Sequence, residues 1–298
     1  MNDYTGRQIA IFTDIHGLLE PTISILEDIK KRNITEIYSL GDNIGVGPNP
    51  SEVLDLLKKY NVKMINGNSE DYTILGLEPF KSYFTEQKIE SQKWTLSKLN
   101  SSQIEMLKNN KHSYDLIIGG KKIGLCHFVN DIRIDYIEGH NAWSYQDAMN
   151  YNWPDPQAQF YYTNSKEQTN KILEKCNSKK EEDKGYVSAY NDRLFDGKTI
   201  DYYDEIIEGH IHFKMISEDE NVKVRTIRAV ALAFKDDPVD KASYIIIKEK
   251  SIGYDIEEIF VTYDRKSMLD SIDKSDMPNK EPINKFVYRW LIILNRMI

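Results

Sequence analysis

Five short segments of the chain contain residue types that bind metals, and each follows directly after a short apolar or β-branched run. They are Asp14-Ile15-His16, Gly41-Asp42-Asn43, Gly67-Asn68-Ser69-Glu70-Asp71, His127 and Gly209-His210-Ile211-His212. Such runs predict β-strands, and loops at strand ends converge from distant sequence positions. Imidazole, carboxylate and amide groups gathered there suit divalent transition metals. Of the six histidines in the chain, four belong to these segments.

The residue types favour a pair of cations, because two divalent ions held about 3.5–4 Å apart need a bridging anion. Asp42 is the carboxylate of its segment and suits the bridge. Asp14 and His16 are two residues apart, so an extended segment would point both side chains the same way. His210 and His212 repeat that spacing.

Two further ligands complete the set. Asn68 offers a neutral carbonyl oxygen, and His127 supplies another imidazole. A single histidine at a strand end is more often bonded to a backbone group. Seven ligand-type residues in five ordered segments favour a metal centre over that explanation.

In their order, the five segments resemble the motifs of the calcineurin-like metallophosphoesterase family, over roughly residues 7–265. The family pattern is Asp-x-His, Gly-Asp, Gly-Asn-His-Asp/Glu, a lone His and Gly-His-x-His. The resemblance implies a cofactor of two divalent metal ions, for which manganese, iron and zinc are all suitable. It also implies that a water or hydroxide bridging both ions attacks phosphorus. The implied ligands of one ion are Asp14, His16, Asp42 and His212, and those of the other are Asp42, Asn68, His127 and His210.

The resemblance further implies catalytic roles for Asp42, Asn68 and His210, and substrate contacts for Asn43 and Ser69. Within the family, residues 41–50 are similar to a bacterial branch of small phosphodiesterases. Residues 67–71 and the chain length are similar to an asymmetric diadenosine tetraphosphatase of that branch.

The chain departs from the family pattern at Ser69, where the family usually has histidine. In the family that histidine contacts the phosphate and helps to protonate the leaving group, and serine is no useful acid near neutral pH. We therefore expect diesters or nucleoside polyphosphates, such as diadenosine tetraphosphate, to be better substrates than alkyl monoesters.

Three functions remain open. The first is a metal-dependent phosphodiesterase or nucleotide pyrophosphohydrolase, which the complete ligand set favours. The second is a catalytically weak metal-binding scaffold of the same fold that acts through protein contacts. A protein phosphatase is disfavoured by Ser69 and by the cap described below. Glu70 and Asp71 either orient the ligands from behind or belong to a solvated loop.

Composition agrees with a soluble enzyme. The 298 residues are 40% hydrophobic and 29% charged, with a net charge of −8. Such an acidic chain has no general attraction for nucleic acid or an anionic membrane. Two cysteines are too few for a disulfide framework. The chain shows no apolar signal run at its start, so we expect a cytoplasmic location. Residues 286–298 are apolar but too few to span a bilayer, and they are expected to pack on the body or on a second subunit, which leaves a homodimer open.

Strands are predicted at 7–13, 36–40 and 62–65, and helices at 20–31 and, capped by Asn49, at 50–60, so the strands should pair in parallel. Helical segments are predicted within 85–109, with a capping box of Ser102 and Glu105. A hairpin is predicted at 114–126 around Gly119-Gly120. Strands at 203–207, 214–216, 222–227, 243–247 and 256–263 are expected to form a mixed or antiparallel second sheet.

The predicted fold class is therefore α/β (α+β), a four-layer α/β/β/α metallophosphoesterase sandwich with a small helical cap insertion. Residues 1–127 and 202–298 would form the metallophosphoesterase domain, and 128–201 the cap. The cap contains many aromatic residues, which either stack on a nucleobase or pack the cap on the body. They are Tyr136, Trp143, Tyr145, Tyr151, Trp153, Phe160, Tyr161 and Tyr162.

Overall fold

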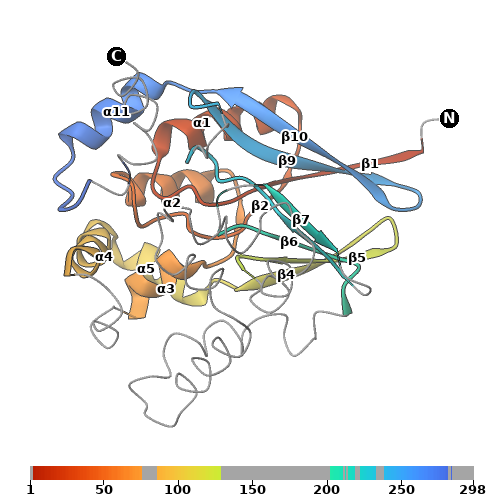
Figure 1. The fold of residues 1–298 in the computed structure, drawn as a ribbon, viewed down its shortest axis with the longest axis horizontal. Helices are drawn as coiled ribbons and strands as arrows, with labels where there is room; N and C mark the ends of the chain where they lie inside the picture. The colour runs from red at the N-terminus through yellow and green to blue at the C-terminus, as the bar shows by residue number, and fades with distance from the viewer. Residues whose placement is uncertain are drawn as a thin grey trace, which may run out of the picture.

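The structure is a computed structural model that describes residues 3–75, 86–128, 202–210, 212, 214–218, 222–232, 238–280 and 283. These residues form two five-stranded sheets and six helices (Figure 1), which confirms the predicted mixed α/β sandwich. The cap prediction, apart from Phe128, and the prediction for 286–298 lie outside the described residues.

The first sheet has the strand order β10-β9-β1-β2-β3. Its strands β1 (Tyr4–Phe12), β2 (Glu36–Ser39) and β3 (Lys63–Met64) are parallel, as predicted. Helices α1 (Leu19–Lys31) and α2 (Pro50–Lys59) connect them. The carboxyl ends of all three strands therefore lie along one edge of the sheet, where the first three ligand segments begin.

The last two strands belong to this first sheet, and the prediction that placed them in the second sheet was wrong. β9 (Lys241–Lys250) runs antiparallel to β1, and β10 (Tyr254–Thr262) pairs with β9. Residues 242–247 of β9 are buried without interruption, which is typical of a strand covered on both faces. β9 thus covers the edge of β1 that β2 leaves open.

The second sheet has the strand order β4-β5-β6-β8-β7. β5 (Lys121–Cys126), β6 (Glu205–Glu208) and β8 (Lys223–Thr226) are parallel, and the edge strands β4 (Ser113–Ile118) and β7 (Met215–Glu218) are antiparallel to their neighbours. Both residues of the predicted Gly119-Gly120 turn have positive φ angles. β5 and β6 direct the last two ligand segments towards the first three.

Two apolar clusters hold these layers together. One lies between the sheets and includes Ile11, Leu40 and Leu125. The other joins the outer face of the first sheet to the helices, which also include α3 (Asn68–Leu75), α4 (Glu86–Lys98), α5 (Ser101–Asn109) and α11 (Arg265–Lys274). A smaller cluster on the other face of the second sheet contains no residue of a described helix, so the fourth layer stays a prediction.

The capping box of α5 lies two residues before the predicted one. The Asn100 side chain accepts a hydrogen bond from the Gln103 amide at 3.0 Å, and the Gln103 side chain accepts one from the Asn100 amide at 3.0 Å. Asn caps a helix as well as Ser does, so α5 begins at Ser101, directly after Asn100, and Ser102 is not the cap.

No helix among the described residues is long and apolar enough to cross a membrane.

Candidate dinuclear metal centre

The candidate ligands meet where the carboxyl ends of five parallel strands converge. Asp14 and His16 follow β1, Asp42 follows β2, Asn68 follows β3, His127 follows β5, and His210 and His212 follow β6. All seven are buried. The loops after β2 and β3 approach so closely that a Cβ on Gly41 would lie 2.6 Å from the Gly67 nitrogen. Only glycine allows that approach.

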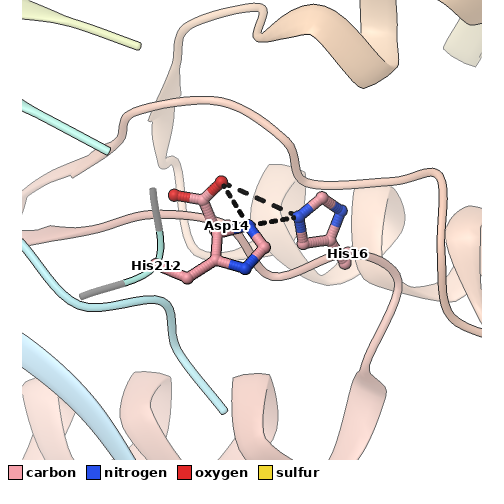
Figure 2. A group of neighbouring side chains, drawn as sticks. All are labelled: Asp14, His16 and His212. Carbon is pink, nitrogen blue, oxygen red and sulfur yellow. Dashed lines mark hydrogen bonds and ion pairs between the residues drawn. The ribbon is translucent and has the colours of Figure 1, made fainter. Parts of the chain in front are cut away.

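Asp14, His16 and His212 form the first group of side chains (Figure 2). His16 Nε2 lies 3.0 Å from His212 Nε2 and 3.7 Å from Asp14 Oδ1, and His212 Nε2 lies 3.3 Å from Asp14 Oδ1. Metal–ligand bonds of 2.0–2.2 Å give ligand–ligand distances of about 2.9–3.6 Å in tetrahedral and octahedral sites. The group therefore has nearly the dimensions of one face of a coordination shell.

The other oxygen of Asp14 is occupied by protein donors. Asp14 Oδ2 accepts hydrogen bonds from Thr13 Oγ1 at 2.7 Å and from the His210 amide at 2.9 Å. Oδ1 accepts none from the described residues. The carboxylate is thus fixed by one oxygen while the other faces the two imidazoles.

Asp42, His127 and His210 form the second group. His127 Nε2 lies 3.2 Å from His210 Nδ1, 3.6 Å from Asp42 Oδ1 and 3.0 Å from Asn68 Oδ1. His127 Nδ1 is 2.8 Å from the Leu40 carbonyl oxygen. Because only a protonated Nδ1 can donate there, the neutral ring presents a lone pair at Nε2. Nε2 and Asn68 Oδ1 are then two acceptors facing each other, an arrangement that a cation would stabilise.

Asp42 connects the two groups. Its Oδ1 faces His127 of the second group at 3.6 Å, and its Oδ2 faces His16 of the first group at 3.6 Å. Oδ1 also accepts a hydrogen bond from the Ser69 amide at 2.7 Å. This is the geometry expected of a carboxylate that bridges two cations.

The backbone at the centre is strained. Among the described residues other than glycine, seven have positive φ angles, and two of these, Asn33 and Asn61, are not candidate ligands. The other five are candidate ligands: Asp14 (54°), His16 (51°), Asp42 (50°), His210 (71°) and His212 (65°). Such residues cost about 1 kcal/mol each, and they cluster at functional sites.

These angles also correct the expected geometry of the first segment, which is not extended. The Asp14 and His16 amides donate to the carbonyls of Gly41 and Asp42 at 3.0 and 2.8 Å. Residues 14–16 therefore run alongside the loop after β2. Their side chains converge because of the left-handed backbone, and not because alternate residues of a strand point the same way.

The buried charges of the two groups are unfavourable for the folded protein when no cation is bound. Burial, and next the charge of Asp14, raise the pKa of Asp42 to about 8. Burial and then His212 lower the pKa of His16 well below its ordinary value. For Asp14, burial acts to raise the pKa, but His212 and the other imidazoles outweigh it and the pKa falls. Two buried carboxylates with a neutral imidazole between them form a site for positive charge.

Glu70 and Asp71 are not in a solvated loop, as one interpretation of the sequence held. Both are buried in the first turn of α3. Glu70 accepts four backbone hydrogen bonds, and Asp71 lies 3.1 Å from His112 Nε2. Burial, and next the charge of Asp42, raise the pKa of Glu70 to about 7, while the Gly67 and Asn43 amides act in the opposite direction.

The two residues predicted to contact substrate have different surroundings. Asn43 is buried, and its side chain accepts a hydrogen bond from Ser39 and donates one to the Ile65 carbonyl at 3.4 Å. These bonds favour a structural role for Asn43. The Ser69 hydroxyl is buried and has no hydrogen-bond partner among the described residues. It faces Gly45, where a Cβ would lie 2.9 Å from the Ser69 oxygen.

Sequence reasoning missed two supporting groups, Thr13 and the carbonyl of Leu40, and left the role of Glu70 open. Backbone carbonyls carry no sequence signal. Glu70 did carry a sequence signal. It lies three residues after Gly67, the residue just before α3, and a glutamate at that position is typical of a capping box. The Gly67 amide donates to it at 2.7 Å in that way.

Comparisons with known proteins find a related sequence and two solved structures of similar fold. An uncharacterized protein of Methanocaldococcus jannaschii is 28% identical over 272 residues, which cover 91% of this chain and 93% of that protein. Two solved structures show the same fold. A hypothetical protein of Pyrococcus horikoshii has 17% identity, covers 94% of this chain and 97% of its own, and has a TM-score of 0.59. A metallophosphoesterase from Sphaerobacter thermophilus has 18% identity, coverages of 94% and 98%, and a TM-score of 0.54.

A model of the calcineurin-like phosphoesterase family matches residues 7–214, which is more than half of the chain. The matched range contains all five ligand segments. The chain belongs to the calcineurin-like phosphoesterase family.

Proposed function

We propose that this protein is a phosphoester hydrolase that depends on two metal ions and acts on phosphodiesters or nucleoside polyphosphates. The observation that carries the proposal is the position of Asp42, whose two oxygens face two separate groups of buried ligands. Asp14, His16, Asp42 and His212 would hold one cation, and Asp42, Asn68, His127 and His210 the other. When bound, two such cations lower the pKa of water and screen the charge of a phosphoryl group.

The residues of the chain prepare the centre for this chemistry. The Leu40 carbonyl fixes His127 with Nε2 facing its neighbours. Thr13 and the His210 amide orient Asp14. The Ser69 amide donates a hydrogen bond to Asp42 Oδ1 and so helps to orient the bridging carboxylate. Preorganised ligands of this kind reduce the entropy that is lost when a cation and substrate bind.

The choice of substrate rests on Ser69. A serine supplies no proton to a leaving group near neutral pH, so the preferred substrates are those whose leaving groups need little protonation. Nitrophenyl diesters and nucleoside polyphosphates, including diadenosine tetraphosphate, meet that condition. Manganese, iron and zinc are the metals we propose, because all three accept mixed imidazole, carboxylate and amide ligands.

The test combines metal analysis with a substrate screen. The purified protein would be supplied with manganese and assayed on bis(p-nitrophenyl) phosphate, an alkyl monoester such as glycerol 2-phosphate, and diadenosine tetraphosphate, beside the Asp42→Asn variant. We expect two metal ions per chain, faster turnover of diesters or polyphosphates than of the monoester, and no turnover by the variant. Two bound metals with no turnover above the Asp42→Asn control would instead support a scaffold that acts through protein contacts.

A further inference from the structure

Glu70 is a buried carboxylate that is not one of the seven candidate metal ligands. It lies in the first turn of α3, and each of its oxygens accepts two backbone hydrogen bonds. Oε1 accepts from the amides of Asn43 at 2.7 Å and Ile44 at 3.2 Å. Oε2 accepts from the amides of Gly67 at 2.7 Å and Asp42 at 3.0 Å. Backbone amides are thus the donors that hold this carboxylate within the described part of the chain.

The four donors belong to two different loops. Asp42, Asn43 and Ile44 follow β2, and Gly67 follows β3. If Glu70 served only to cap its own helix, the bond from Gly67 would be sufficient. Three of the four bonds instead reach the loop that carries the proposed bridging ligand.

That loop needs such support because of its backbone. Asp42 has a φ angle of 50°, which is unfavourable for a residue other than glycine. Its amide and the next two amides all point to Glu70. With these three amides bound, the oxygens of the Asp42 side chain lie near His16 and His127.

We propose that Glu70 is a positioning residue which fixes Asp42 between the two cation positions, so that binding of two ions as a bridged pair depends on it. This inference rests on the proposed function, because it assumes that the two groups bind cations. It adds a residue that touches neither cation and acts through the backbone of the bridging ligand.

The four backbone amides need four acceptor positions at this place. Two oxygens with two acceptor positions each match four N–H donors. A glutamine of the same shape would turn its NH2 group towards two of those donors, and one pair of hydrogen bonds would be lost. The Glu70→Gln variant should therefore release one side of the loop without removing any metal ligand.

Asp71→Asn is the matched control. Asp71 is the next residue in α3, is also buried, and contacts His112 at 3.1 Å instead of the ligand loops. Both variants neutralise one buried carboxylate of the same helix turn. A loss that follows from damage to α3 alone would appear in both.

The experiment uses the full chain and manganese alone as the probe. Chelator competition would give the affinity for each ion, electron paramagnetic resonance would detect the spin-coupled signal of a bridged manganese pair, and thermal unfolding would compare the folded states. We expect Glu70→Gln to weaken binding of the pair by about 10–100-fold, as for other residues that orient metal ligands, and to lose the coupled signal. Asp71→Asn should keep both.

Three results would overturn the inference. One is a Glu70→Gln protein that binds the coupled pair with the affinity of the wild type, and another is an equal loss in both variants. A wild type that forms no coupled pair would overturn it as well. If Glu70→Gln does not fold, Glu70→Asp keeps the charge but is one methylene shorter, and it would be subject to the same comparison. A wild type that binds the coupled pair but hydrolyses nothing would contradict the proposed function alone.

Discussion

The substitution Asp42→Asn should stabilise the protein when no metal is bound, although it removes the central ligand. Asp14 Oδ1 and Asp42 Oδ2 both lie near His16 Nε2, at 3.7 and 3.6 Å, so they are at most about 7 Å apart. Two negative charges at that distance repel by about 2 kcal/mol at an effective dielectric constant of 20. Asparagine keeps the oxygen that accepts from the Ser69 amide at 2.7 Å and removes the charge.

The gain should depend on pH in a defined direction. Burial, and next Asp14, raise the pKa of Asp42 to about 8 in the folded protein, whereas an unfolded aspartate has a pKa of about 3.9. Because the folded state binds the proton more tightly, the metal-free wild type loses stability as the pH rises from about 4 to 8. The variant lacks that loss, so its advantage should be smaller at pH 5 than above pH 8, where the loss is complete.

The assay is thermal unfolding in the presence of a chelator at pH 5 and pH 8.5. A gain of about 2 kcal/mol corresponds to about 4 °C in a chain of this size. Glu27→Gln on the exposed face of α1 controls for the general effect of removing a negative charge. With manganese added, the order should reverse, because only the wild type binds the pair. A variant that is no more stable than the wild type at pH 8.5 without metal would refute the electrostatic argument.

Four further substitutions test single positions. Gly209→Ala should lose metal binding and more than about 2 kcal/mol of stability, because its Cβ would lie 2.5 Å from Asp14 Oδ2. The control Gly120→Ala adds a Cβ that meets nothing within 4 Å, so it should lose only about 1 kcal/mol of stability, from its positive φ. Equal urea unfolding midpoints for the two glycine variants would contradict this difference. Asn100→Ala should cost about 1 kcal/mol in the same assay, since it removes the cap of α5; a change below the error would sink that assignment. Ser69→His should raise monoester turnover relative to diester turnover, and an unchanged ratio would remove the leaving-group argument.

The ligand set could be predicted from sequence because its signal is chemical and local. A His, Asp or Asn directly after a β-branched run is visible without knowing the partner strand. The structure brings Asp14, His16 and His212 together, although residue 212 is 196 positions away from His16. What the sequence could not supply was the left-handed backbone at these residues, because it depends on hydrogen bonds between two loops.

Strand pairing shows the same limit at longer range. The strands at 243–247 and 256–263 were recognised by their composition, but composition does not say which sheet they join. β9 pairs with β1 across more than 230 residues, as in the register Ile9 with Ile247. Closeness in sequence favoured pairing with the strands just before them, but β9 instead pairs with the edge of β1 that β2 leaves open.

The two sheets are joined differently at their two ends. At one end, a backbone hydrogen bond from Gly253 to the Gly119 carbonyl at 2.8 Å ties the β9–β10 turn to the β4–β5 turn. At the other end, each cation position takes ligands from both sheets, so bound metal would act as a cross-link between them. Removing the metal would remove this cross-link, and the ligand end would then be held by protein contacts such as the hydrogen bond from the His210 amide to Asp14. Amide hydrogen exchange in a chelator should then accelerate first around the ligand loops and last around the glycine turns.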